Sequence, residues 1–198
     1  MPQQPLEINV LYKSGSGRET SFTAIAGNTD CLDVEHYETE AFSGLEGGFA
    51  VTLNGNHTIF QSTEFTQLTD AINFLIHSLY WVQNKTAFRF DSNDFFPNDD
   101  LIKNTGKHII RLQSLNEREL VFSSAANPGN KGGKRGNSFF DGVILNKEEW
   151  FNQADIALKE YFDVLLYVIK TNHHSNTCEA MLDYFEMWTN ISVLQEND

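Results

Sequence analysis

Cysteine, proline and long apolar runs are all scarce in this sequence of 198 residues. Its two cysteines, Cys31 and Cys178, lie far apart, so they suggest neither a disulfide framework nor the paired ligands of structural zinc. No stretch approaches 18 consecutive apolar residues, the length that indicates a transmembrane helix. The first residues have no basic start and no apolar core of signal-peptide length. We therefore expect a reduced, cytoplasmic protein.

Basic residues are also scarce, and their distribution is uneven. The chain has 14 Lys and Arg against 27 Asp and Glu, for a net charge of −13. Residues 1–61 carry −6 and residues 140–198 carry −8, whereas residues 62–139 carry +1. Binding to nucleic acid or to an anionic membrane needs a cationic face, so we expect neither as a direct partner.

The clearest structural signal is a long amphipathic helix at residues 146–170. Its apolar residues recur in steps of three and four, the period of one helix face, at Phe151, Ala154, Leu158, Phe162, Leu165 and Ile169. Asn146 is a suitable N-cap, and Glu149 is placed to reach back to the amide of the cap residue. We interpret this segment as the helix around which the fold is built.

The remaining patterns predict an α+β fold. Strands are expected at residues 6–12, 20–26, 34–42, 49–53, 57–61, 86–90, 108–113, 119–123 and 138–145. Asn54 and Gly55 lie between two alternating runs, the strongest hairpin signal in the chain. Two further helices are expected at residues 64–83 and 178–194. We expect one domain, residues 1–198, in which an antiparallel sheet packs against about three helices, two of them C-terminal.

Three loops invite a ligand-binding interpretation, and each fails on spacing. The basic, glycine-rich segment 127–137 lacks the spacing, the hydroxyl and the following helix of a phosphate-binding loop. The acidic segment 91–100 departs from the EF-hand pattern after its first positions. His173 and His174 lie near Cys178, but no second ligand pair follows. We therefore expect no metal and no cofactor, and we find no catalytic constellation.

Carboxylates form two stripes on the C-terminal helices. Glu179, Asp183, Glu186 and Asn190 are spaced by four, three and four residues, opposite Met181, Phe185 and Trp188. A second stripe holds Glu148, Asn152, Asp155, Lys159 and Asp163. These stripes are either solvated helix faces or a binding surface, and the scarcity of lysines four residues away favours a cationic partner. The candidate partner-binding residues are Glu179, Asp183, Glu186, Asp155 and Asp163.

These patterns support one functional hypothesis and one alternative. The hypothesis is an acidic binding protein that neutralises a basic protein, either a toxin or a nucleic-acid-binding protein. Its most concrete form is an immunity protein that occludes the active site of a nuclease-type toxin, with electrostatic steering of the encounter. The alternative is a small-molecule enzyme whose site assembles from residues distant in sequence.

Overall fold

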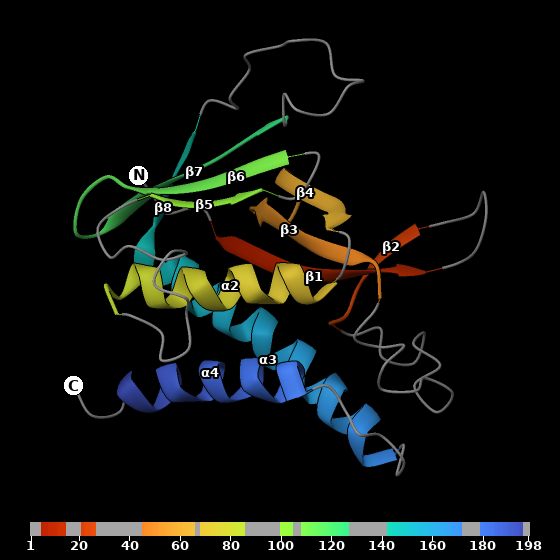
Figure 1. Ribbon diagram of the computed structural model, residues 1–198. Helices are drawn as coiled ribbons and strands as arrows, with labels where there is room; N and C mark the ends of the chain where they lie inside the picture. Colours follow the sequence, from red (N-terminus) through yellow and green to blue (C-terminus); the bar gives the residue numbers. More distant parts are fainter. Residues whose placement is uncertain are drawn as a thin grey trace.

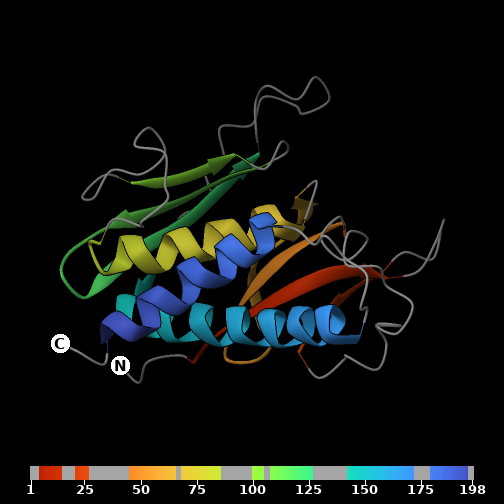
Figure 2. The same cartoon turned by 60° about the horizontal axis from the view of Figure 1, so that its bottom comes forward.

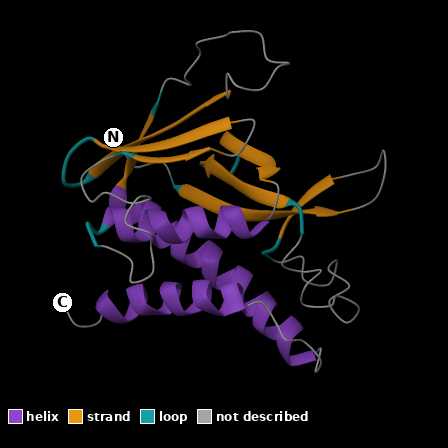
Figure 3. Cartoon of the chain, viewed as in Figure 1, coloured by secondary structure: helices purple, strands orange, loops and turns teal. Residues whose placement is uncertain are grey.

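The computed structural model describes residues 5–14, 21–26, 45–65, 68–85, 100–104, 108–126, 142–171 and 179–195. Within these ranges the chain forms two four-stranded antiparallel sheets and three helices, of which two follow the last strand (Figure 1). The helices gather on one side of the strands, as Figure 3 shows. The expected α+β fold is confirmed, with the strands divided between two sheets.

The first sheet, sheet A, has the strand order β2-β1-β3-β4. Its strands are β1 (Leu6–Ser14), β2 (Ser21–Ala24), β3 (Gly47–Leu53) and β4 (His57–Phe65). Asn54, Gly55 and Asn56 join β3 to β4, and the first two have φ values of 56° and 68°. Positive φ at both central residues is the requirement of a type I′ turn, so the predicted hairpin is confirmed.

The second sheet, sheet B, is a meander in the order β5-β6-β7-β8. Its strands are β5 (Leu101–Asn104), β6 (His108–Ser114), β7 (Glu119–Ala126) and β8 (Val143–Asn146). Strand β5 was not predicted from the sequence, because four residues are too few to show a clear alternation. The register places Leu101 beside Leu112 and Leu112 beside Phe122, and all three side chains are buried.

Helix α2 (Leu68–Val82) begins later than predicted. Residues 64 and 65 belong to β4 instead, where Phe65 pairs with Gly47 across the sheet. The expected helical role of Phe65 is therefore wrong, because its apolar spacing also suits a strand that continues from residue 57. Gly47 has a steric reason to lack a side chain, since a Cβ there would collide with the carbonyl oxygen of Leu11.

Helix α3 (Lys147–Thr171) confirms the long helix predicted from the sequence. Asn146 caps it, because its side-chain oxygen accepts a hydrogen bond of 3.1 Å from the amide of Glu149. The Glu149 carboxylate does not serve as expected: it accepts a 2.8 Å hydrogen bond from the amide of Leu6 in β1. A second apolar row, on Trp150, Ala157, Tyr161, Val164 and Val168, is buried as well, so α3 is covered on two sides.

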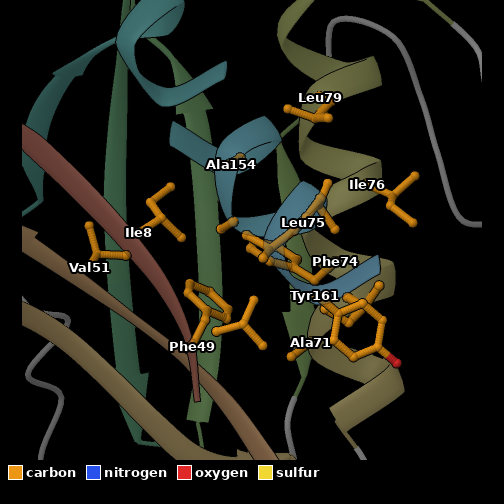
Figure 4. Packing of buried hydrophobic residues seen from close by; sticks show 14 of the residues in the cluster. Ile8, Phe49, Val51, Ala71, Phe74, Leu75, Ile76, Leu79, Ala154 and Tyr161 are labelled. Carbon is orange, nitrogen blue, oxygen red and sulfur yellow. The ribbon is translucent and has the colours of Figure 1, made fainter. Parts of the chain in front are cut away.

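Helix α4 (Glu179–Gln195) lies across α2 and α3, on the side away from the sheets (Figure 2). The core between the sheets and helices is one continuous cluster, part of which Figure 4 shows around Phe49, Phe74 and Tyr161. Phe49 stacks on Phe74 of α2 with ring centroids 5.6 Å apart. Phe122 of sheet B stacks on Trp150 of α3 at 5.5 Å. Both sheets therefore share their core with the helices.

Several expectations fall outside the described residues. They are the strands at 34–42 and 86–90, the basic segment 127–137, the acidic segment up to residue 99, and the group of His173, His174 and Cys178. None of the described helices combines the length and the apolar character that a membrane span requires.

Candidate functional site

Three hydrogen bonds fix the rotation of α4 about its axis. The Trp188 indole donates to Asp155 of α3 over 2.7 Å. The Tyr80 hydroxyl of α2 donates to the carbonyl of Met187 over 2.6 Å, and the Asn73 amide donates to the Tyr184 hydroxyl over 3.0 Å. All three contacts lie on one side of α4. The opposite side of the helix is thereby turned away from the core.

Apolar packing supports the same orientation. Met181, Met187 and Ile191 of α4 are buried. Trp188 stacks on Phe162 of α3 with ring centroids 5.2 Å apart and planes tilted by 20°. Glu186 and Asn190 are exposed and Asp183 is half-buried, so the polar stripe of α4 lies on the outside, as its spacing predicts. The side chain of Glu179, the remaining member, lies outside the described residues.

The stripe of α3 divides into residues with different roles. Asp163 is exposed beside Lys159, with 3.8 Å between the ammonium and the carboxylate. Asp155, in contrast, accepts the hydrogen bond of Trp188 and so belongs to the contact between α3 and α4. Burial raises the pKa of the neighbouring Glu160, while Lys159 lowers it and Asp163 raises it again. Of the two α3 carboxylates predicted from the sequence, Asp163 is the one on the outer surface.

Exposed apolar side chains accompany these carboxylates. The described chain exposes seven large hydrophobic side chains, and four of them lie on α3 and α4: Ile156 at 47%, Leu166 at 38%, Tyr167 at 53% and Leu182 at 47%. These four side chains were not predicted from the sequence to be exposed, although all of them fall outside the apolar period of their helices. That interruption of the polar face is the signal that could have found them.

We use the term outer helical face for a set of solvent-facing residues of α3 and α4 taken together. It consists of Ile156, Lys159, Asp163, Leu166 and Tyr167 of α3 with Leu182, Asp183 and Glu186 of α4. Helix α4 contains three carboxylates and neither lysine nor arginine. Single exposed hydrophobic side chains are ordinary on a protein surface, whereas contiguous ones mark interaction sites.

Titratable groups elsewhere do not form a comparable site in the described residues. Burial, and then the nearby Lys103 ammonium, lower the pKa of His77 from 6.5 to about 3. Lys103 itself lies 3.7 Å from the carboxylate of Asp70. In the part of the chain that the structure describes, no three His, Cys, Asp or Glu side chains come together as metal ligands.

Lys147 is a second perturbed group, and its contacts are structural. Its ammonium donates to the Ser114 hydroxyl over 2.7 Å and lies 5.8 Å from the centre of the Trp81 ring. Burial lowers the pKa of Lys147, and the charge of Glu117 opposes that shift. The lysine therefore joins the start of α3 to the end of β6.

Comparison with known proteins gives no relative. No protein-family model, no curated protein and no solved structure matches this chain.

Proposed function

We propose that this protein binds and neutralises a basic protein partner. The most concrete form of the proposal is an immunity protein that occludes the active site of a nuclease-type toxin. The observation that carries it is the outer helical face, where Asp163, Asp183 and Glu186 occur among exposed apolar side chains. An enzyme that acts on nucleic acid presents a cationic surface to its substrate, and an acidic surface complements it.

Charge and apolar contact have different tasks in such a complex. Carboxylates attract a cationic partner over a distance of about 10 Å at 0.1 M salt, and this attraction raises the association rate. Exposed apolar side chains such as Tyr167 and Leu182 make close contacts that govern dissociation. Glu179, Asp183, Glu186 and Asp163 supply the steering charge in this proposal. Asp155 contributes indirectly, by holding Trp188 and thus α4 in place.

For the alternative, a small-molecule enzyme, the best candidate is His77, whose pKa is the most strongly shifted among the described residues. An imidazole with a pKa of about 3 is neutral at pH 7 and is a weak base. General acid-base catalysis near neutral pH is most efficient with a pKa close to 7. The shift of His77 thus follows from burial beside Lys103 and does not favour catalysis at neutral pH.

The test uses two charge-reversal variants that change the net charge equally. Affinity capture from the native host first supplies the partner. Stopped-flow association is then measured for Asp183→Lys with Glu186→Lys, and for the control Glu7→Lys with Glu117→Lys, whose side chains are exposed elsewhere. The helix variant is expected to slow association by roughly tenfold or more, and the control by much less, since steering raises rates by about 10 to 1,000.

Two outcomes would contradict the proposal. Equal rates for the two variants would show that only the total charge matters and that the outer helical face is not the site. A rate that does not change between about 0.1 M and 1 M salt would exclude steering altogether. Inhibition assays on a captured nuclease complete the test, because occlusion predicts full inhibition at one protein per enzyme.

A further inference from the structure

Sheet B has an outer face that carries exposed isoleucines. Alternate residues of its strands point toward α2 and α3, as buried Leu112, Phe122 and Leu145 show. The residues between them point the other way. Ile102 on β5 is 59% exposed and Ile144 on β8 is 58% exposed, the highest values among the large hydrophobic side chains of the described residues. These two isoleucines mark the two edge strands of one surface, with half-buried Ile109, Val121 and Ala125 between them.

The charges on this outer face nearly cancel. Arg111 donates through its Nε to the Asp100 carboxylate over 2.7 Å, and a second guanidinium nitrogen contacts the same oxygen. Glu119 lies at the start of β7, where it accepts a 2.7 Å hydrogen bond from Asn116 beside the turn. Arg111 lies on a central strand of the face beside Ser123, and in the described residues its charge is paired with the Asp100 carboxylate. The apolar side chains of the face surround this pair.

We propose that a second copy of this chain docks on the outer face of sheet B, giving a symmetric dimer. The charge distribution selects this occupant. Each copy carries a net charge of −13, so contact through the outer helical faces would bring like charges together. The outer face of sheet B avoids that repulsion and offers apolar side chains to bury. Among the described residues, a basic partner, in contrast, finds only the Glu119 carboxylate on this face, because the Asp100 carboxylate is paired with Arg111.

The geometry of the sheet suits a two-fold contact. A symmetric dimer uses the same patch on both copies, so the patch must be complementary to itself. With sheets packed face to face about 10 Å apart, a two-fold axis along the strands places β5 of one copy over β8 of the other. Ile102 of each copy then lies on the same side as Ile144 of its partner. The helices cover the opposite face of sheet B, so the dimer leaves both outer helical faces available (Figure 1).

The response to salt distinguishes this dimer from the complex of the proposed function. Two copies of an acidic chain repel each other, and salt screens that repulsion, so added salt strengthens the dimer. A complex between the acidic protein and a basic partner weakens with salt, because the same screening reduces attraction. Opposite responses mean that either proposal can fail while the other holds.

Sedimentation equilibrium of the purified full chain tests the dimer over a wide range of concentration and salt. The expected mass is twice the 22.5 kDa of one chain, with tighter association at high salt. Ile102→Lys with Ile144→Lys is expected to weaken the dimer by more than tenfold, which corresponds to about 1.4 kcal/mol. Leu182→Lys is the control on the outer helical face and is expected to remain dimeric.

Circular dichroism checks that each variant folds. If the lysine variant does not fold, Ile102→Ser with Ile144→Ser is the milder alternative. A wild-type mass of one chain at every concentration and salt would overturn the proposal. A different protein would then be the candidate partner for this face. Equal masses for the sheet variant and the Leu182→Lys control would overturn it as well, and so would assembly beyond a dimer.

Discussion

The outer helical face and the outer face of sheet B differ in charge far more than in apolar exposure. Four of the seven exposed large hydrophobic side chains lie on the first, and Ile102 and Ile144 lie on the second. The helices add carboxylates without a matching number of lysines, whereas sheet B pairs Arg111 with Asp100. In the two proposals, exposed apolar area supplies the contact and the surrounding charge selects the partner.

The two surfaces also arise from different backbone periods. On α3 and α4 the outer residues return every three or four positions, so charged and apolar side chains share one helix face. On sheet B every second residue points outward, so Ile102 and Ile144 each follow or precede a side chain that faces the core. A change at either surface can leave the core beneath it intact, because the inner and outer residues are distinct.

The largest expected effects come from the core that both surfaces share. Leu158 is on the buried side of α3 and Leu112 is on the buried side of β6. Both are fully buried in one cluster. Replacement of either by Ala should lower the free energy of unfolding by about 2–5 kcal/mol. Leu166→Ala, at a side chain 38% exposed, is the control and should cost much less. Urea denaturation measures all three, and a small loss at Leu158 alone would show that the helices do not share the core of sheet B.

A pH effect is expected where α2 meets sheet B. In the unfolded chain His77 takes up a proton near pH 6.5, but in the folded chain it does so only near pH 3, because burial and Lys103 oppose its charge. Below about pH 6.5 the unfolded state therefore binds more protons than the folded state. As the pH decreases from 6.5 to 3, the free energy of unfolding decreases by up to about 1.4 kcal/mol per pH unit. Above pH 6.5 this contribution is constant.

The His77→Gln variant isolates that effect. Its stability should change less between pH 6.5 and pH 3 than that of the wild type, whatever its absolute value. Urea denaturation across this range gives the two slopes. Parallel slopes would mean that His77 is as easily protonated in the folded protein as in the unfolded chain.

A smaller effect separates two carboxylates of the same helical stripe. Asp155→Ala removes the acceptor of the Trp188 indole and should cost about 1–3 kcal/mol. Asp163→Ala removes an exposed side chain whose ion pair with Lys159 is solvated, and should cost within about 0.5 kcal/mol. Thermal melts compare the two variants. A larger loss at Asp163 than at Asp155 would contradict the roles that the contacts indicate.

Local patterns were sufficient for some of these features. The period of α3 predicted its buried face, and Asn54 with Gly55 predicted the hairpin between β3 and β4. The spacing of Asp183 and Glu186 predicted that they lie on the outside of α4. These properties depend on neighbours within a few turns of helix or residues of strand, so sequence alone carries them.

Other features depend on contacts between distant segments. The hydrogen bond between Asp155 and Trp188 joins residues 33 apart in the sequence. The lowered pKa of His77 depends first on its burial and then on Lys103, which lies in a strand too short to recognise. The start of α2 was predicted too early because Phe65 fits either a helix or a strand, and pairing with Gly47 decides between them. Tertiary pairing supplies the information that periodicity lacks.

The hydrogen bond between Leu6 and Glu149 has a consequence for how the chain reaches its native state. It joins residues 143 apart in sequence, and β1, which contributes Leu6, also pairs with β2 and β3 in the interior of sheet A. A contact of such long range forms only after a large loop has closed, and the loss of chain entropy comes before the stabilisation. Proteins that depend on such contacts therefore fold slowly. A ribosome must make α3 before β1 can complete its packing. During that interval α2 can already cover part of sheet A, but the apolar surface of β1 that α3 covers stays exposed and favours aggregation of the nascent chain.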